Sequence, residues 1–274
     1  IYVGNDFHED DYLYINRGNG SFTDEITHSV MHTSQFSMGV DAADANNDGL
    51  PEIVSMDMLP SDRYILKRSL GEDEYDVFYH KIDYGYNYQY TRNNLQYNRG
   101  NGMFSETGLY SGVAATDWSW SSLIADFDND GLKDLFVTNG ILRRPNDLDY
   151  IKYYSDADYN GMEQNSKSSD SNLIQKMPAG KVHNYMFRGT DSLKYADKSL
   201  EWGFETPTWS NGAAYADLDN DGDLDLVINN INEPAAVYKN NSTGNHFLDI
   251  ELKGNAGNKF GMGAKVIVKQ NGGI

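Results

Sequence analysis

The sequence predicts a mainly β protein built from a repeated antiparallel unit. A nine-residue stretch rich in Asp and Asn occurs three times, at 44–52, 126–134 and 217–225, and each copy leads into an apolar run of strand length. A hairpin pattern precedes each copy. The separation between the hairpin aromatic and the first Asp is 22 residues in every case, from Phe22 to Asp44, from Phe104 to Asp126 and from Tyr195 to Asp217. A constant offset indicates one structural unit that is repeated.

Each unit begins with the hairpin, which we expect over 13–24, 95–106 and, in a more degenerate form, 185–197. In the first two copies Gly-Asn-Gly separates runs that alternate apolar and polar residues. Gly and Asn tolerate the positive φ angles of tight hairpin turns, so this pattern predicts two strands joined by a short turn.

A strand of small and apolar residues precedes each Asp-rich stretch, at 37–43, 121–125 and 210–216. Small residues suit an inner strand where backbones approach closely, although ordinary tight sheet packing explains them equally well. With the strand that follows each Asp-rich stretch, every unit has four antiparallel strands. Repeated radially, this is the architecture of β-propeller blades.

The Asp-rich stretches have the chemistry of a calcium loop. In 217–225, acidic side chains stand at positions 1, 3, 5 and 9. Like charges in so short a loop cost on the order of 1 kcal/mol per pair at a wet surface unless a cation lies between them. Calcium accepts six to eight hard oxygen ligands, Gly222 at position 6 permits the sharp turn, and the carbonyl of Asp223 at position 7 is the expected backbone ligand.

An EF-hand shares the first six positions, but it needs a Glu at position 12 and a helix on each side. Position 12 is Ser55, Val137 and Ile228 in the three copies, and the last carboxylate stands at position 9. The runs that follow are β-branched and aromatic, so we expect calcium loops that join two strands.

Two insertions lengthen the repeat, at about 58–94 and 141–184. The first is expected to contain a helix over 72–82 followed by a Tyr-rich segment, and the second helical turns near 147–154 and 171–177. Insertions of this length in a repeat protein usually lie on one face and often form its binding surface. Beyond 237–241, which resembles the start of a fourth hairpin, strands over 247–252 and 261–269 are expected to open another β module.

Composition excludes some partners. Asp and Glu outnumber Lys and Arg by 41 to 22, a net charge of -19, so nucleic acid is not an expected partner. The sequence has no Cys. It also has no apolar run of 18 residues, so no membrane span is expected. All-oxygen calcium sites fill readily where calcium is millimolar, which favours an extracellular, cell-surface or periplasmic location. The first residue is Ile, and we expect that an upstream part with a signal region precedes it.

The three Asp-rich loops resemble the FG-GAP/VCBS repeats of integrin-α-like β-propellers. The tail from 246 to 273, with Gly-Met-Gly-Ala-Lys-Val at 261–266, looks like the start of an ASPIC/UnbV domain. The whole chain is similar to VCBS-repeat, ASPIC/UnbV-containing surface proteins of Bacteroidetes-type bacteria. The resemblance implies propeller repeats over 1–240 and the start of an ASPIC/UnbV-like β module over 246–274.

The same resemblance implies a set of calcium ligands in each loop, three calcium ions in all. They are Asp44, Asn46, Asp48, Leu50 (carbonyl) and Glu52; Asp126, Asp128, Asp130, Leu132 (carbonyl) and Asp134; and Asp217, Asp219, Asp221, Asp223 (carbonyl) and Asp225. The first loop departs most from the pattern, with a neutral Asn at position 3 and the longer Glu at position 9. It is expected to bind calcium most weakly, since affinity follows ligand charge.

We expect a non-catalytic, calcium-stabilised propeller that acts in adhesion or in protein or glycan binding, because the sequence has no nucleophile elbow, P-loop, HExxH or Cys. The alternative is a propeller-type polysaccharide lyase or hydrolase that uses the Tyr-rich insertion, with Tyr84, Tyr86, Tyr88 and Tyr90 near His80, Lys81 and Arg92. Alternating Tyr more simply predicts a half-buried strand.

The tryptophans have two interpretations. Trp118, Trp120 and Trp209 precede inner strands, where packing between blades is the simpler role and stacking on a sugar ring the alternative. Trp202 is most simply a core residue.

Overall fold

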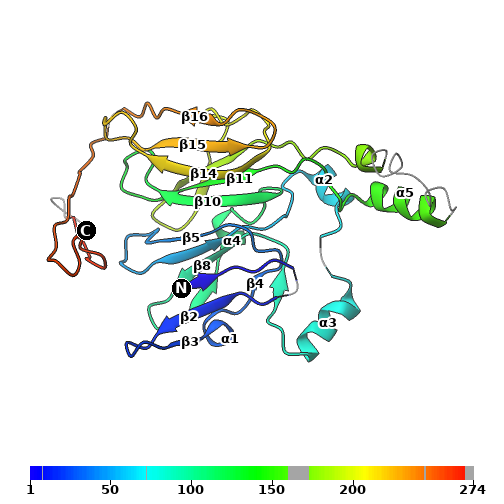
Figure 1. Cartoon of the computed structure of the whole chain (residues 1–274), viewed down its shortest axis with the longest axis horizontal. Coiled ribbons are helices and arrows are strands. Elements are labelled where there is room, and N and C mark those ends of the chain that lie inside the picture. Colours follow the sequence, from blue (N-terminus) through cyan, green and yellow to red (C-terminus); the bar gives the residue numbers. More distant parts are fainter. Residues whose placement is uncertain (8, 72, 160–172, 244, 269–274) are drawn as a thin grey trace.

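Four antiparallel sheets follow one another in chain order in the computed structural model, which describes residues 1–7, 9–71, 73–159, 173–243 and 245–268 (Figure 1). The first sheet has β1 (Tyr2–Val3), β2 (Tyr12–Asn16) and β3 (Phe22–Asp24). The second has β5 (Val40–Ala43), β6 (Glu52–Ser55), β8 (Asn94–Asn98) and β9 (Phe104–Glu106). The third has β10 (Ser119–Ala125), β11 (Asp134–Asn139), β12 (Tyr185–Gly189) and β13 (Tyr195–Asp197). The fourth has β14 (Ser210–Ala216), β15 (Asp225–Asn230) and β16 (Ala236–Tyr238).

The remaining elements are short. A parallel pair joins β4 (Thr33–Ser34) to β7 (Gln89–Tyr90). The helices are α1 (Ile26–Ser29), α2 (Arg63–Arg68), α3 (Tyr75–Asp83), α4 (Gly108–Ser111) and α5 (Leu148–Tyr159). None of the helices in the described ranges has the length and apolarity that a membrane crossing requires.

The mainly β prediction is confirmed, and strands lie at the predicted hairpins and on both sides of each Asp-rich stretch, but the grouping of strands into sheets is shifted by two strands. The hairpin before an Asp-rich loop does not pair with the strands around that loop. Instead β8 pairs with β6, and β12 pairs with β11. A sheet therefore consists of the strands on both sides of one loop and the hairpin that follows. After the hairpin, residues 25–39, which contain α1, or 107–118, which contain α4, carry the chain across to the next sheet.

The shift places both insertions inside sheets, between the second and third strands, rather than between units. The helix predicted at 72–82 is α3, and α5 extends the turn predicted at 147–154, whereas α2 was not predicted. Of the turn predicted at 171–177, residues 171 and 172 lie outside the described residues, and 173–176 are helical.

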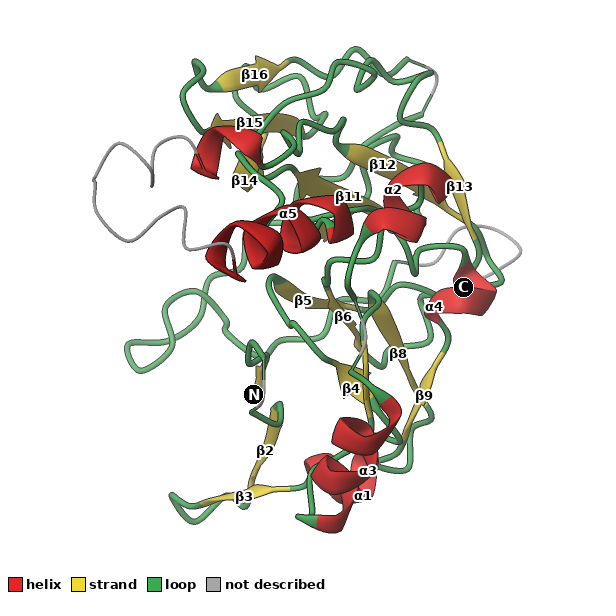
Figure 2. Cartoon of the chain, turned by 90° about the vertical axis from the view of Figure 1, so that its right-hand side faces the viewer, coloured by secondary structure: helices red, strands yellow, loops and turns green. Residues whose placement is uncertain are grey.

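The two insertions contact each other at the end of the sheets opposite to the Asp-rich loops. Arg68 Nη2 lies 3.0 Å from Asp147 Oδ2, and the Leu70 N–H donates to the Asn146 carbonyl at 2.8 Å. The strand after a loop runs away from that loop, because it is antiparallel to the strand before it. The insertion that follows this strand therefore begins at the end of the sheet opposite to the loop. Figure 2, which faces that end, shows α2, α3 and α5 in front of the strands.

Core side chains fill the spaces between neighbouring sheets in three clusters. The largest joins the second and third sheets through residues such as Val54, Leu95, Ile124 and Phe187. The inner strands approach closely, as the small residues predict: a Cβ added to Gly39 would lie 2.1 Å from the Trp120 carbonyl oxygen. Trp120 itself donates from Nε1 to the Gly140 carbonyl at 2.7 Å.

The strands expected over 247–252 and 261–269 are absent from the described part of the tail, residues 245–268, while 269 lies outside it. The tail instead runs beside the ends of the sheets that carry the Asp-rich loops (Figure 1). The Asn245 side chain donates to the Asp128 carbonyl at 2.8 Å, and a Cβ on Gly222 would lie 1.9 Å from the Phe247 ring. Alternating residues form a stable strand only when a sheet edge pairs with them, and here none does.

Candidate metal-binding loops

The three Asp-rich loops, named loop 1 (44–52), loop 2 (126–134) and loop 3 (217–225), share one backbone conformation. The Asn at position 4 is left-handed in each, with φ of 60° at Asn47, 55° at Asn129 and 62° at Asn220. Gly at position 6 follows with φ of 87°, 91° and 90°. Only Gly, and less readily Asn, adopts this region at low cost, which explains the residue types at both positions.

Backbone N–H groups hold the carboxylates in place around the centre of each loop. The position 1 carboxylate accepts from the N–H at position 6: Asp44 from Gly49 at 2.8 Å, Asp126 from Gly131 at 2.9 Å and Asp217 from Gly222 at 3.0 Å. The position 5 carboxylate accepts from the N–H at position 7: Asp48 from Leu50 and Asp130 from Leu132 at 2.8 Å, and Asp221 from Asp223 at 3.1 Å. These hydrogen bonds fix the orientation of the position 1 and position 5 carboxylates in each loop.

Carboxylates converge in two of the loops. Oxygen atoms of Asp126, Asp128 and Asp130 lie within 4.8 Å of one another, and so do those of Asp217, Asp219 and Asp225. Among the described residues, the acids of loop 1 are not gathered in this way. There the neutral Asn46 side chain donates to Asp48 Oδ2 at 3.0 Å, where a carboxylate stands in the other two loops.

The donor set fits calcium on two further observations. Asp44 Oδ1 is buried and has no hydrogen-bond partner in the described structure. In loop 2 burial, together with the smaller effect of the Asp128 and Asp126 carboxylates, raises the pKa of the Asp134 carboxyl to about 7. Both observations describe acidic oxygens whose ionised form a bound cation would favour. Carboxylate oxygens with one backbone carbonyl are the ligands that calcium prefers.

The position 9 carboxylates, Glu52, Asp134 and Asp225, are buried and tie each loop to the third strand of its sheet. Asp134 accepts from the Phe127 N–H at 3.0 Å and from the Gly189 N–H at 2.9 Å. The corresponding bonds reach Asp225 from Leu218 and Asn240 at 3.0 and 2.8 Å, and Glu52 from Ala45 and Asn98 at 2.9 and 3.5 Å. Sequence reasoning predicted position 9 only as a ligand and missed this structural bridge.

The loops also contact one another through position 4, a link that sequence reasoning missed. Asn47 of loop 1 donates to the Gly131 carbonyl of loop 2 at 2.7 Å. Asn129 of loop 2 donates to Asp223 Oδ1 of loop 3 at 2.6 Å and points at the Gly222 carbonyl at 3.5 Å. The signal was present, since Asn occupies position 4 in all three copies.

Two basic side chains that the sequence analysis did not single out lie over loops 2 and 3. Arg188 Nε lies 2.6 Å from Asp128 Oδ2, and Nη2 contacts Asp130. Lys239 Nζ contacts Asp219 and lies 3.3 Å from Asp221 Oδ2. In both loops the cation meets the carboxylates at positions 3 and 5.

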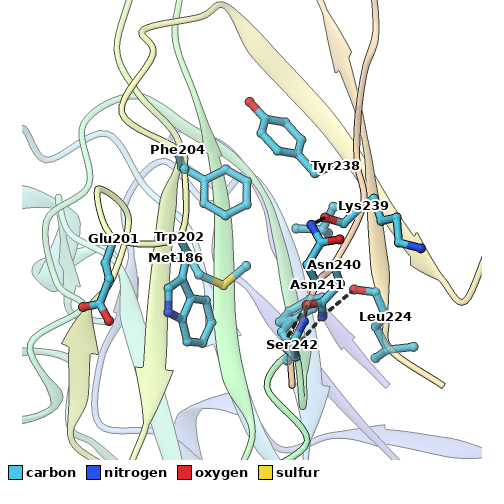
Figure 3. A pocket seen from close by; sticks show the side chains of 13 residues that line it. Met186, Glu201, Trp202, Phe204, Leu224, Tyr238, Lys239, Asn240, Asn241 and Ser242 are labelled. Atoms are coloured by element: carbon cyan, nitrogen blue, oxygen red, sulfur yellow. Dashed lines mark hydrogen bonds between the residues drawn. The ribbon is translucent and has the colours of Figure 1, made fainter. Parts of the chain in front are cut away.

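A recess of about 440 Å³ lies between the third and fourth sheets (Figure 3). Met186, Trp202, Phe204 and Tyr238 form its apolar part, and a run from Lys239 to Ser242 forms its polar part. Trp202 packs against the core cluster between these sheets, as predicted, but it also lines this recess.

The Tyr-rich segment is not a half-buried strand, apart from Tyr90 in β7. Tyr84, Tyr86 and Tyr88 are exposed, because the chain turns after α3 and finds a strand partner only at Gln89. Tyr84 and Tyr86 instead line an open recess of about 370 Å³ with Tyr12 and the carboxyl-bearing Glu9, Asp10 and Asp24.

Comparison with known families agrees with this architecture. A family model described as FG-GAP-like repeat matches residues 1–55 and 76–137, which include the first two loops and the hairpin between them. The match supports an FG-GAP repeat protein, and such repeats suggest a surface or binding-type repeat domain. Loop 3 lies outside the matched residues, although its backbone has the same conformation. No curated protein sequence matches the chain.

Proposed function

We propose that the chain is a non-catalytic, calcium-stabilised β-propeller segment of an exported or cell-surface protein, which binds a protein or a glycan. The observation that carries the proposal is the threefold occurrence of one loop geometry, with converging carboxylates in two copies and an unpartnered buried carboxylate oxygen in the third. The structure provides four consecutive sheets for such a propeller.

Calcium would act as a clip between strands. In each loop the side chains at positions 1, 3, 5 and 9 and the carbonyl at position 7 would hold the ion, and the position 9 carboxylate links the loop to the third strand. An ion that binds only the folded chain stabilises it by mass action, about 2.7 kcal/mol per site at a concentration of 100 times the dissociation constant. Such stabilisation operates where calcium is millimolar, so we propose an extracellular, cell-surface or periplasmic location.

We propose two candidate binding surfaces, the aromatic recess and the two insertions. The aromatic recess between the third and fourth sheets has the combination of flat apolar side chains and amide groups that suits a sugar or a protein side chain. The two insertions, joined through Arg68 and Asp147, add a protruding surface at the opposite end of the sheets from the loops.

The direct test of the calcium part is a count of bound ions. Calorimetric titration of the chelator-treated chain with calcium should give three ions per chain, and magnesium should bind much more weakly because it demands smaller, near-octahedral sites. Binding of fewer than two calcium ions, or equal binding of magnesium, contradicts the proposal.

A polysaccharide-active enzyme remains the second candidate, because Tyr84 and Tyr86 lie in a recess with three carboxyl side chains instead of in a strand. Incubation with uronate-containing and neutral polysaccharides, followed by analysis of chain length and of unsaturated sugar ends, tests it. Cleavage that is lost in Tyr86→Phe with an unchanged melting temperature would favour the enzyme.

For residues 246–274, the start of an ASPIC/UnbV-like module is likewise a proposal, carried by the residue pattern at 261–266.

A further inference from the structure

The third strands of the second, third and fourth sheets pair in one shared register with the strands that follow loops 1, 2 and 3. Strand pairing aligns Gln96 with Ile53 in the second sheet, Phe187 with Leu135 in the third and Tyr238 with Leu226 in the fourth. The next residue in each case is therefore equivalent, and these residues are Tyr97, Arg188 and Lys239. Two of the three sheets carry a basic side chain here, and the sheet of loop 1 carries a neutral one.

The two basic side chains meet the same pair of carboxylates in their loops. Arg188 contacts Asp128 and Asp130, and Lys239 contacts Asp219 and Asp221, which are positions 3 and 5 in both loops. These are the loops with the most acidic residues: loop 3 has Asp at positions 1, 3, 5, 7 and 9, and loop 2 has four Asp. In the sheet of loop 1, which has an Asn at position 3, the equivalent strand residue is the neutral Tyr97.

We infer that Arg188 and Lys239 are built-in counter-cations that compete with calcium for the position 3 and position 5 carboxylates. The inference rests on the proposed calcium binding and adds its regulation. A carboxylate oxygen that accepts from a guanidinium or an ammonium group is not free to coordinate an ion in the same direction, and a fixed positive charge a few Å away repels a divalent cation. Calcium must therefore displace the side chain when it binds.

The geometry permits that displacement. The Arg188 side chain is 41% exposed and the Lys239 side chain 55% exposed, so both can swing into water without leaving a buried charge behind. The counter-cations have two consequences. They stabilise loops 2 and 3 in the metal-free chain, and they reduce the calcium affinity that four or five carboxylates would otherwise give. The order of affinity among the three loops therefore does not follow ligand charge alone.

The test is Arg188→Met in the full chain, which keeps the unbranched apolar stem and removes the charge. We expect the variant to melt at a lower temperature than the wild type in chelator, to gain more from saturating calcium, and to bind one of its calcium ions about tenfold more tightly by calorimetry. Lys239→Met provides the same test at loop 3 with the same readouts. If one of the two variants folds poorly, the other still tests the inference. The reciprocal variant, Tyr97→Lys, should weaken one calcium site of the chain.

The matched control is Arg99→Met, which removes a basic residue from the hairpin turn of the second sheet, where Arg99 donates to Ser105 Oγ at 3.4 Å. Its calcium affinity and its calcium-induced stabilisation should equal those of the wild type. Unchanged or weaker calcium binding in both Arg188→Met and Lys239→Met overturns the inference but leaves the proposed calcium binding intact. Absence of calcium binding by the wild type overturns both.

Discussion

At the scale of single residues, the loops combine two requirements that act against each other. Their carboxylates must converge for an ion, and they must be tolerated before the ion arrives. Backbone N–H groups, as at Asp44 and Asp126, and the basic side chains of Arg188 and Lys239 meet the second requirement. Loop 1 meets it with a neutral amide at Asn46, which donates to Asp48. Different residues thus serve the same electrostatic need.

The unpartnered oxygen of Asp44 leads to a first prediction. In Asp44→Asn the side-chain oxygen can still accept from the Gly49 N–H, while one negative charge beside Asp48 and Glu52 disappears. We expect an unchanged or slightly higher melting temperature in chelator, and a calcium-induced rise smaller than in the wild type, because a charged ligand is lost. Paired thermal scans measure both. A lower melting temperature in chelator would show that Asp44 stabilises the chain without calcium.

Asp11 leads to a prediction about pH. This fully buried carboxyl accepts from the Tyr2 hydroxyl at 2.6 Å and the Asn5 N–H at 2.8 Å, and burial raises its pKa from 3.8 to about 6. The folded chain therefore holds a proton that the unfolded chain releases, and this contribution to stability falls as the pH rises from about 4 to 6 and is constant above. Across that interval the unfolding free energy of the wild type should fall on the order of 2 kcal/mol more than that of Asp11→Asn, which has no carboxyl at this position. Denaturant unfolding at several pH values with saturating calcium measures it, and parallel curves for both chains contradict it.

At the scale of elements, neighbouring sheets are joined twice. Apolar side chains fill the space between them, and at the loop ends the position 4 amides reach from one loop to the next, from Asn47 to Gly131 and from Asn129 to Asp223. This second link connects the candidate metal-binding loops directly. A loop that calcium orders would hold its neighbour through this hydrogen bond.

The Asn129→Gly variant tests the link between loops 2 and 3, because Gly accepts the left-handed φ of 55° and lacks the amide. We expect a loss of about 1 kcal/mol of unfolding free energy and a reduced dependence of one calcium binding step on the other. The control is Asn220→Gly, which has the same backbone conformation and whose amide contacts no further loop among the described residues. Equal effects of the two substitutions would assign the loss to backbone flexibility alone.

At the scale of the whole molecule, local patterns predicted the strands well and their partners less well. Gly-Asn-Gly turns and the apolar runs after each loop placed the hairpins and inner strands, because those signals depend on backbone preferences of a few residues. The assignment of a hairpin to the sheet of the preceding loop depends on pairing between Val54 and Leu95, about 40 residues apart, and no local pattern encodes that.

The same difference between local and long-range information explains which parts of the candidate site could be predicted. Spacing predicted the acids that converge in loops 2 and 3, namely Asp126, Asp128 and Asp130 and Asp217, Asp219 and Asp225, since loop geometry is set within nine residues. The contacts of Arg188 and Lys239 depend on strand register, and the contact between Asn47 and Gly131 depends on how two sheets pack. The tail failed for a third reason: the alternating pattern at 247–252 is compatible with a strand, but the described structure offers that segment no paired edge.

The central claim, that calcium in the three loops stabilises the folded chain, is tested most directly by thermal unfolding in millimolar calcium and in excess chelator. With three linked sites, the account predicts a calcium-dependent rise of many degrees that follows the calcium concentration and is not reproduced by equal magnesium. An identical melting temperature in calcium and in chelator would contradict the account, because the loops would then be held by their hydrogen bonds and basic side chains alone.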